Sequence, residues 1–317
     1  MKINTIIQGD TLTELKKLPD ESIDCCITSP PYWTQRFYGG GENEIGLEKT
    51  PERYIKDLFI VFKELKRVLK KSGTFWLNID DVYYGSGHGK ADDLTGSKQG
   101  TIKGMSDKNM RSFFNKQRNL PHNFLKKKDL CLIPFRLIDK LQKDGWYIRN
   151  CIIWYKPNAM PENVKDRFVN DYEFLFLLTK SYKYYFKQIL EPYLQKLNRW
   201  GGIINRGIET NKYKQMARKR SYRPNQNGRL KRSVWSINTS GWRDITEHVA
   251  PFPQELIDPL IKAGCPEKGL ILDPFMGSGT TAIVAKRNKC NWLGIELNPD
   301  YVKIANKRIN NEPEPLL

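Results

Sequence analysis

The sequence predicts a doubly wound α/β fold with a mostly parallel sheet, and three observations support this prediction. Short apolar segments of strand length alternate with helical segments over the first 80 residues, and the alternation returns between residues 253 and 309. In this second region an apolar strand runs into a glycine-rich turn that opens a helix. Parallel strands need crossover connections, so the alternation is typical of a parallel sheet with helices on both faces.

Three strands and a short helix are expected in the N-terminal region. Residues 2–8 alternate between apolar and polar side chains, as in a half-buried strand, and this strand ends near Asp10. A helix at 11–18 leads to a second strand at 23–28, and a third strand is expected at 74–79.

A long helix is expected between the second and third of these strands. Thr50 is a suitable N-cap, Pro51 occupies the first helical position, and Gly73 is expected to end the helix. The apolar residues of this segment recur at helical spacing and form one face: Ile55, Leu58, Phe59, Phe62, Leu65 and Leu69. This face predicts packing against the sheet.

The other elements follow from the same patterns. A helix is expected at 131–145, and strands are expected at 147–156 and 172–180. The C-terminal region predicts a helix at 253–264, a strand at 270–275, a helix at 279–288, a strand at 290–297 and a helix at 299–309.

Positive charge is concentrated in two irregular segments. Of the formal net charge of +18, residues 86–130 carry ten Lys/Arg against four Asp, and residues 191–234 carry twelve Lys/Arg against two Glu. Residues 85–128 are rich in Gly, Ser, Lys and Asp, which indicates a mobile insertion. Because each neutralised phosphate releases a counterion, two such blocks favour a nucleic-acid partner over a merely solubilising surface.

The glycine-rich turn has the arrangement of a nucleotide-binding βαβ unit. Residues 277–282, Gly-Ser-Gly-Thr-Thr-Ala, fit the relaxed G-x-G-x-x-G/A pattern, and Glu296 follows at the end of the next strand. Glycines let the backbone approach a ligand, and a carboxylate in that place binds ribose hydroxyls. A turn that only closes a βα unit is the alternative.

Asp273 indicates which nucleotide this unit binds. It lies at the tip of the strand before the turn, where a fixed carboxylate disfavours a pyrophosphate and favours an ammonium group. S-adenosylmethionine (SAM) is such a ligand, with its amino-acid moiety near Asp273 and its ribose at Glu296. Asp10, at another strand end, either accepts a hydrogen bond from the adenine amino group or only caps the helix at 11–18.

A second unusual stretch is Thr28-Ser-Pro-Pro-Tyr-Trp33. Its two prolines bias the preceding residues to extended backbone and remove two N–H donors. The Pro30 carbonyl and the Ser29 side chain could then face a substrate as fixed hydrogen-bond acceptors. Tyr32 offers a face on which a base can stack, and Trp33 is expected to help wall the pocket. Taken alone, the stretch also fits a rigid loop with surface aromatics.

Together these motifs resemble the DNA amino-methyltransferases, which modify an exocyclic nitrogen of a base. The family's tetrapeptide of Asp, Asn or Ser, then Pro-Pro, then an aromatic is similar to residues 29–32, and its SAM motif is similar to residues 273–281. Residues 126–167, 172–186 and 248–257 also resemble family segments. The resemblance covers most of the chain outside the two basic blocks, and it implies a Rossmann-like SAM-methyltransferase sheet.

The resemblance implies a role for each matching residue. The catalytic residues would be Ser29, Pro30, Pro31 and Tyr32. The SAM-binding residues would be Asp10, Thr28, Phe252, Asp273, Pro274, Phe275, Gly277, Ser278, Gly279, Thr280, Thr281 and Glu296. No metal is implied. A base inside a duplex cannot reach such a pocket, so base flipping is expected.

The order of the motifs implies a circular permutation. The catalytic loop precedes the SAM loop, as in the β-class arrangement of the family, where target recognition lies between them. The expected parts are a catalytic half at 1–85 and 131–190, a basic flexible insertion at 86–130, a target-recognition region at 191–234 and a SAM-binding half at 235–317.

The leading Ser29 bears on the base that is modified. Family members with Ser in this place mostly act on cytosine N4, and those with Asp mostly act on adenine N6, so the resemblance favours N4-cytosine methylation of double-stranded DNA. Cytosine C5 methylation is rejected, because that family uses Pro-Cys and only the reverse order, Cys265-Pro266, occurs here. The resemblance also implies a restriction-modification role, with a cognate endonuclease as a possible partner.

Three alternatives remain open at this point. The first is an adenine N6-methyltransferase of the same family. The second is a non-catalytic DNA-binding protein with a methyltransferase fold, which intact loops at 29–32 and 273–281 argue against. The third is a nicotinamide-dependent oxidoreductase, which Asp273 and the basic blocks argue against.

The remaining features predict a reduced, cytoplasmic protein. No apolar run approaches the roughly 18 residues that suggest a membrane span, and the N-terminus lacks a signal-peptide pattern. The six cysteines form no Cys-x-x-Cys pair and the three histidines are far apart in sequence, so no zinc site is expected. A monomer and a homodimer are both compatible with the sequence.

Overall fold

The computed structural model describes residues 1–35, 38, 44–85, 120–193, 227–239 and 252–313. The chain forms two compact units, a larger one made of Met1–Phe186 and Ser233–Leu317 and a smaller one, Lys187–Arg232. Most of the predicted insertion at 86–130 and of the target-recognition region at 191–234 lies outside the described residues.

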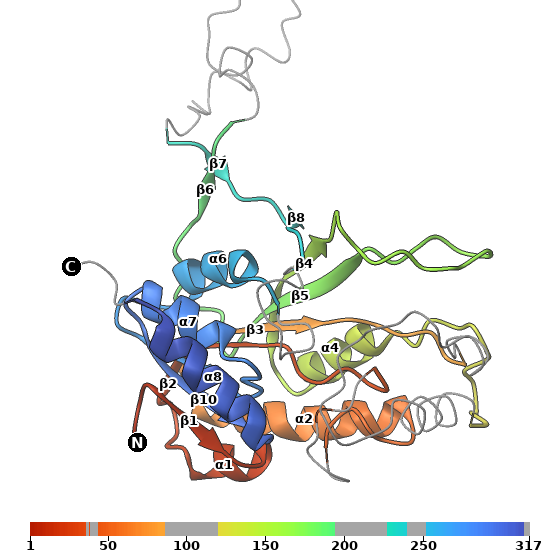
Figure 1. The fold of residues 1–317 in the computed structure, drawn as a ribbon, viewed down its shortest axis with the longest axis horizontal. Helices are drawn as coiled ribbons and strands as arrows, with labels where there is room; N and C mark the ends of the chain where they lie inside the picture. Colours follow the sequence, from red (N-terminus) through yellow and green to blue (C-terminus); the bar gives the residue numbers. More distant parts are fainter. Residues whose placement is uncertain (36–37, 39–43, 86–119, 194–226, 240–251, 314–317) are drawn as a thin grey trace, which may run out of the picture. The chain divides into compact units, whose positions relative to one another are not determined.

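The larger unit is built on one eight-stranded sheet, in the order β1-β10-β9-β2-β3-β5-β4-β8 (Figure 1). The strands are β1 (Thr5–Gln8), β2 (Ile23–Thr28), β3 (Leu69–Ile79), β4 (Tyr147–Tyr155), β5 (Tyr172–Thr179), β8 (Val234–Ser236), β9 (Leu270–Asp273) and β10 (Asn291–Glu296). All pairings are parallel except those of β5, which is antiparallel to both β3 and β4. The predicted mostly parallel sheet is therefore confirmed.

The six helices of the described ranges pack in two groups of three. In one group α2 (Pro51–Val68) lies between α1 (Thr11–Lys17) and α4 (Ile133–Lys143). In the other α7 (Thr280–Arg287) lies between α6 (Gln254–Gly264) and α8 (Pro299–Asn311). Figure 1 shows the blue helices α6, α7 and α8 on one side of the sheet and α1, α2 and α4 on the other. This confirms the doubly wound arrangement.

Helix α2 begins as the sequence predicts and ends earlier. The Thr50 side chain accepts a hydrogen bond from the Arg53 N–H, and the first helical residue is Pro51. The prediction that Gly73 ends the helix is wrong, because the helix ends at Val68 and Leu69 already pairs with Ile23 in the sheet. Gly73 lies within β3, where an added Cβ would approach the Leu69 side chain to 2.7 Å.

Two further differences concern strands. The first strand begins at Thr5 instead of residue 2. The three short strands β6 (Leu190–Glu191), β7 (Arg229–Leu230) and β8 carry no readable alternation and were not predicted. In the smaller unit β6 pairs with β7, and in the larger unit β8 extends the sheet beside β4.

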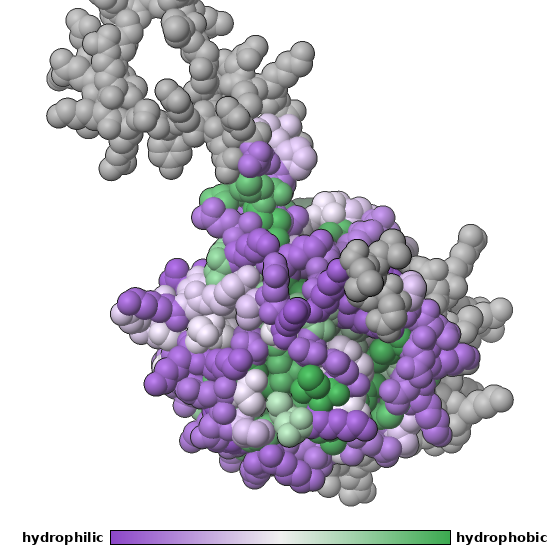
Figure 2. Space-filling view, turned by 90° about the vertical axis from the view of Figure 1, so that its left-hand side faces the viewer, coloured by the Kyte–Doolittle hydropathy of each residue, from purple (hydrophilic) through white to green (hydrophobic). Residues whose placement is uncertain are grey.

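The described residues can be compared with the features of membrane, disulfide-bonded and metal-binding proteins. Figure 2 shows a mostly hydrophilic face with a small apolar area. None of the helices in the described ranges combines the length and the hydrophobicity that crossing a bilayer requires. All six cysteines are free thiols, and five of them are buried. The described residues hold no group of three or more His, Cys, Asp or Glu side chains arranged for a metal ion.

Candidate active site

The predicted site residues come together at the edge where the parallel strands end. Strand β1 pairs with β10 so that Gln8 lies beside Glu296, and β10 pairs with β9 so that Asp273 lies beside Gly294. Strand β2, next to β9, ends at Thr28 and leads into the predicted catalytic loop, residues 29–32. Because β5 is antiparallel, its first residues reach the same edge. The pairing of β2 with β9 thus joins motifs some 240 residues apart in sequence.

Asp273 is buried and accepts three hydrogen bonds. Its exposed fraction is 1%, and its carboxylate accepts hydrogen bonds from the hydroxyls of Thr28 at 2.7 Å and Thr281 at 2.6 Å. The Phe275 N–H donates a third bond at 3.1 Å. Burial raises the pKa of Asp273 to about 6, and the three hydrogen bonds oppose that rise. The hydrogen bond from Thr28 connects this carboxylate to the residue directly before Ser29.

Glu296 holds the glycine-rich loop. Its carboxylate accepts the N–H of Gly277 at 2.7 Å and the N–H of Asn298 at 2.9 Å. Burial raises its pKa above the ordinary value for a glutamate, and the backbone N–H groups lower it. The loop needs glycine at Gly279, whose φ is +82° and whose added Cβ would lie 3.0 Å from Ala305 Cβ.

Side chains from α1 and α8 hold other residues of the glycine-rich loop. Arg308 donates to both the carbonyl and the hydroxyl of Ser278 at 2.6 Å. The Pro274 carbonyl accepts the Thr11 hydroxyl at 2.7 Å. The Thr280 hydroxyl is buried and has no hydrogen-bond partner among the described residues. A polar ligand at the loop would satisfy that hydroxyl, so the residues present fit a nucleoside cofactor.

Two predicted SAM residues have other surroundings. Asp10 accepts the N–H of Thr13 at 2.8 Å and the Thr13 hydroxyl at 2.7 Å, so it is the N-cap of α1. Both bonds use Oδ1, so a contact of Oδ2 with adenine remains a prediction. Phe252 is half-buried, two residues before α6, and its contact with SAM also remains a prediction.

Core residues hold the predicted catalytic loop in place. The Tyr54 hydroxyl donates to the Pro31 carbonyl at 2.8 Å. Trp33 is 1% exposed, donates its indole N–H to the Glu48 carbonyl at 2.8 Å and stacks on Tyr84. Trp33 is therefore a core residue that supports the loop, and the expectation that it lines the pocket is not met. No described residue donates a hydrogen bond to the Pro30 carbonyl.

A polar cluster next to this loop was missed by the sequence analysis. The Glu173 carboxylate accepts the Tyr32 hydroxyl at 2.7 Å, the Asn78 amide at 2.9 Å and the Lys156 ammonium at 2.6 Å. Burial raises the pKa of Asp80 to about 8, the charge of Glu173 adds to the rise, and Lys156 opposes it.

A sequence signal for the cluster existed. Glu173 is the one acid in the apolar run of β5, Asn78 is the one amide in β3, and Asp80 directly follows β3. Polar residues in otherwise buried strands are unusual, and each of these lies at the edge of the sheet that carries the site.

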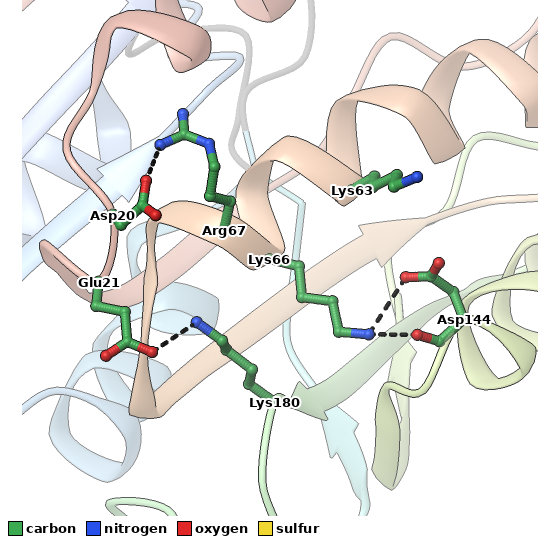
Figure 3. Close-up of a pocket in the computed structure, with 7 residues that line it drawn as sticks. All are labelled: Asp20, Glu21, Lys63, Lys66, Arg67, Asp144 and Lys180. Atoms are coloured by element: carbon green, nitrogen blue, oxygen red, sulfur yellow. Dashed lines mark hydrogen bonds and ion pairs between the residues drawn. The ribbon is translucent and has the colours of Figure 1, made fainter.

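A cavity among the described residues lies elsewhere. Figure 3 shows that ion pairs cross it, and its volume is about 730 Å³. Glu21 lies before β2 and pairs with Lys180 after β5, so this cavity is at the opposite edge of the sheet from Asp273. Its lining residues are Asp20, Glu21, Lys63, Lys66, Arg67, Asp144 and Lys180. Three ion pairs join six of the seven charged side chains, which indicates a structural ion-pair cluster at this edge of the sheet.

Comparisons of sequence with known proteins point in one direction. A family model described as DNA methylase matches residues 23–307. The chain is 39% identical over 308 residues to the type II methyltransferase M.Cfr9I of Citrobacter freundii, covering 97% of this chain and 88% of that protein. It is 37% identical over 304 residues to the type II methyltransferase M.SmaI of Serratia marcescens, covering 96% and 90%.

Comparisons of structure agree with this fold. The PvuII DNA methyltransferase (cytosine-N4-specific) aligns with a TM-score of 0.63 at 19% identity, over 98% of this chain and 88% of that chain. TTHA0409 from Thermus thermophilus in complex with S-adenosyl-L-methionine aligns with a TM-score of 0.54 at 22% identity, over 97% and 95%. At these identities the two structures support the architecture of the sheet and its flanking helices.

Proposed function

Because this chain belongs to the DNA methylase family, we propose that it is a SAM-dependent DNA methyltransferase that modifies the N4 amino group of a flipped cytosine. Family membership confirms the expected DNA methyltransferase and leaves no support for a nicotinamide-dependent oxidoreductase. The observation that carries the choice of cytosine is Ser29, a neutral side chain at the head of the catalytic tetrapeptide.

Two acceptors prepare the amino group for attack. The nitrogen of an amino-substituted base is a poor nucleophile, because its lone pair is delocalised into the ring. The Ser29 hydroxyl oxygen and the Pro30 carbonyl would accept its two hydrogens and favour a tetrahedral nitrogen. The carbonyl of Pro31 already accepts the Tyr54 hydroxyl, which keeps the loop in place. Acceptors positioned in advance need little reorganisation when charge develops.

The remaining residues position the base and the methyl donor. Tyr32 would stack on the flipped base. SAM supplies an electrophilic methyl group on a sulfonium. Asp273 would attract the ammonium group of SAM and Glu296 its ribose hydroxyls, next to the glycine-rich loop. Since Thr28 hydrogen-bonds Asp273 and precedes Ser29, the donor and the acceptors would be neighbours, and methyl transfer to nitrogen would be direct. The surplus amino proton would leave to water.

The biological setting extends the same proposal. The curated relatives are named type II methyltransferases, which supports a restriction-modification role with a cognate endonuclease acting on the same site. The basic residues of 191–234 would contact double-stranded DNA as the target-recognition region, and the cytoplasm would be the compartment.

Nucleoside mass spectrometry tests the choice of base. The protein is incubated with bacterial genomic DNA that lacks its modification and with SAM, and the DNA is then digested to nucleosides. We expect N4-methylcytosine in amounts that grow with enzyme and time. N6-methyladenine as the product would replace cytosine by adenine in the proposal, and the absence of both would refute it.

The affinity for SAM is expected to depend on pH through Asp273. Its pKa is raised to about 6 by burial, and the ammonium group of SAM would favour the ionised carboxylate. Protonation therefore competes with binding, so the Kd for SAM should rise by up to tenfold for each pH unit below about 6. Isothermal titration calorimetry between about pH 5 and pH 7 measures this. The Asp273→Asn variant should bind SAM more weakly and lose this slope, and an equal slope in both proteins would contradict the assignment.

A further inference from the structure

The Tyr32 hydroxyl lies in the middle of a series of hydrogen bonds between Ser29 and Glu173, called the relay below. Ser29 Oγ is 3.1 Å from the Tyr32 oxygen, and that oxygen is 2.7 Å from Glu173 Oε2. The relay connects the catalytic loop after β2 to Glu173 at the start of β5, which is 141 residues further along the sequence than Tyr32. Both ends are therefore fixed by strands of the sheet.

Two residues hold Glu173, which is the end of the relay away from Ser29. Lys156, after β4, makes an ion pair with Glu173 Oε1 at 2.6 Å. Asn78, in β3, donates its amide to Glu173 Oε2 at 2.9 Å and to the Phe174 carbonyl at 3.2 Å. The side chains of Lys156 and Glu173 are only 15% and 12% exposed, so water screens this pair weakly.

The number of protons on each group determines which residue donates and which accepts in each hydrogen bond of the relay. A carboxylate that is paired with an ammonium group only accepts hydrogen bonds, so the single proton of Tyr32 points to Glu173. The Asn78 carbonyl oxygen is a second acceptor for it, but at 3.3 Å it is more distant. Burial and the charge of Glu173 raise the pKa of Tyr32 well above its ordinary value, so the phenol keeps its proton. The contact with Ser29 then requires that Ser29 donates its own proton to the Tyr32 oxygen.

This direction decides what Ser29 can offer to a base. Its one proton is committed to Tyr32, so its lone pairs are left to accept. A serine hydroxyl that rotated freely would instead also donate, for example to the ring nitrogen beside the amino group. Hydrogen bonds in such a chain polarise one another, which makes the Ser29 oxygen a stronger acceptor.

We propose that Glu173 is a positioning residue that acts through Tyr32 to hold Ser29 as an acceptor for the amino group that is methylated. The inference rests on the proposed function, in which Ser29 accepts a hydrogen from that group. Lys156 and Asn78 keep the Glu173 carboxylate in place, and Tyr32 has a second role besides stacking on the base. In this arrangement the neutral serine only accepts hydrogen bonds from the base, because its own proton is donated to Tyr32.

A double-mutant cycle on Glu173→Gln and Tyr32→Phe tests the proposal. Transfer of labelled methyl groups from SAM to DNA is measured under single-turnover conditions, together with the Kd for SAM and the melting temperature. We expect Glu173→Gln to reduce the transfer rate by about tenfold or more, the scale of one interaction in a coupled network, with the Kd for SAM unchanged within about twofold. In the Tyr32→Phe background, which has no hydroxyl to transmit the effect, Glu173→Gln should change the rate by less than about twofold.

The matched control is Glu21→Gln, which removes a carboxylate paired with Lys180 at the opposite edge of the sheet and should leave the rate unchanged. An equal rate loss from Glu173→Gln in both backgrounds would overturn the proposal, because it would show a structural effect independent of the Tyr32 hydroxyl. An unchanged rate in the single variant would overturn it as well. The cycle counts all methyl groups transferred, so it is read separately from the mass spectrometry that tests the choice of cytosine.

Discussion

Replacing Ser29 by alanine is expected to lower the rate of methyl transfer by about 100-fold or more and to leave SAM affinity unchanged. The scale is that of removing one preorganised hydrogen-bonding group from a site where charge develops. Ser29 Oγ lies 3.1 Å from the Tyr32 oxygen at the end of the relay from Glu173, so the substitution also takes away the group that the relay positions. Single-turnover transfer of labelled methyl groups to DNA gives the rate, and calorimetry gives the Kd for SAM.

The control for this experiment is Ser22→Ala. Ser22 lies just before β2, at the other end of the strand that leads to Ser29, and its hydroxyl donates only to the Pro19 carbonyl at 2.8 Å. The same chemical change there should leave the rate at the wild-type value. If Ser29→Ala also methylated at the wild-type rate, the acceptor role of Ser29 would be refuted, and with it the purpose of the relay.

Replacing Glu296 by alanine is expected to weaken SAM binding by about 100-fold or more. The substitution removes the acceptor for the Gly277 and Asn298 N–H groups, at 2.7 Å and 2.9 Å, and the carboxylate proposed to hold the ribose. The loss corresponds to two charge-assisted hydrogen bonds from the ribose hydroxyls to this carboxylate, at about 1.5 kcal/mol each. Calorimetry measures the Kd, and at saturating SAM the transfer rate should recover far more than it does in Ser29→Ala.

Glu267→Ala is the matched control for Glu296. Glu267 is exposed and lies before β9, at the opposite edge of the sheet, so its removal should not change the Kd for SAM. Melting temperatures of both variants separate lost binding from lost folding. Wild-type SAM affinity in a folded Glu296→Ala protein would mean that the ribose is held by another group.

Local signals in the sequence predicted most elements because each signal acts within a few residues. The Thr50 cap and Pro51 set the start of α2 through hydrogen bonds and backbone angles of that turn alone. The end of α2 was missed for the opposite reason: Leu69 pairs with Ile23, some 46 positions earlier, and this tertiary pairing prevails over the glycine at Gly73. Likewise β8 has three residues and exists because β4 offers it an edge.

The candidate site likewise has residues that local motifs predict and residues that only the fold brings together. Ser29 to Tyr32 and the loop at 273–281 were found because each is a contiguous motif whose chemistry can be recognised in isolation. Asn78 lies in β3, Glu173 lies in β5 and Lys156 follows β4, and nothing local connects them. Only the antiparallel position of β5 between β3 and β4 brings Asn78 and Glu173 to the Tyr32 hydroxyl and Lys156 to Glu173.

The sequence by itself determined the class of fold, the order of the two motifs and the residue types that can bind a nucleoside or accept hydrogens from an amino group. These properties depend on short-range spacing and on side-chain chemistry. Only the tertiary structure decided that Thr28 bonds Asp273, that Trp33 belongs to the core and that Ser29 is connected through Tyr32 to Glu173. Those contacts depend on which strands are neighbours, and a hydrophobic pattern along one strand does not specify its partner.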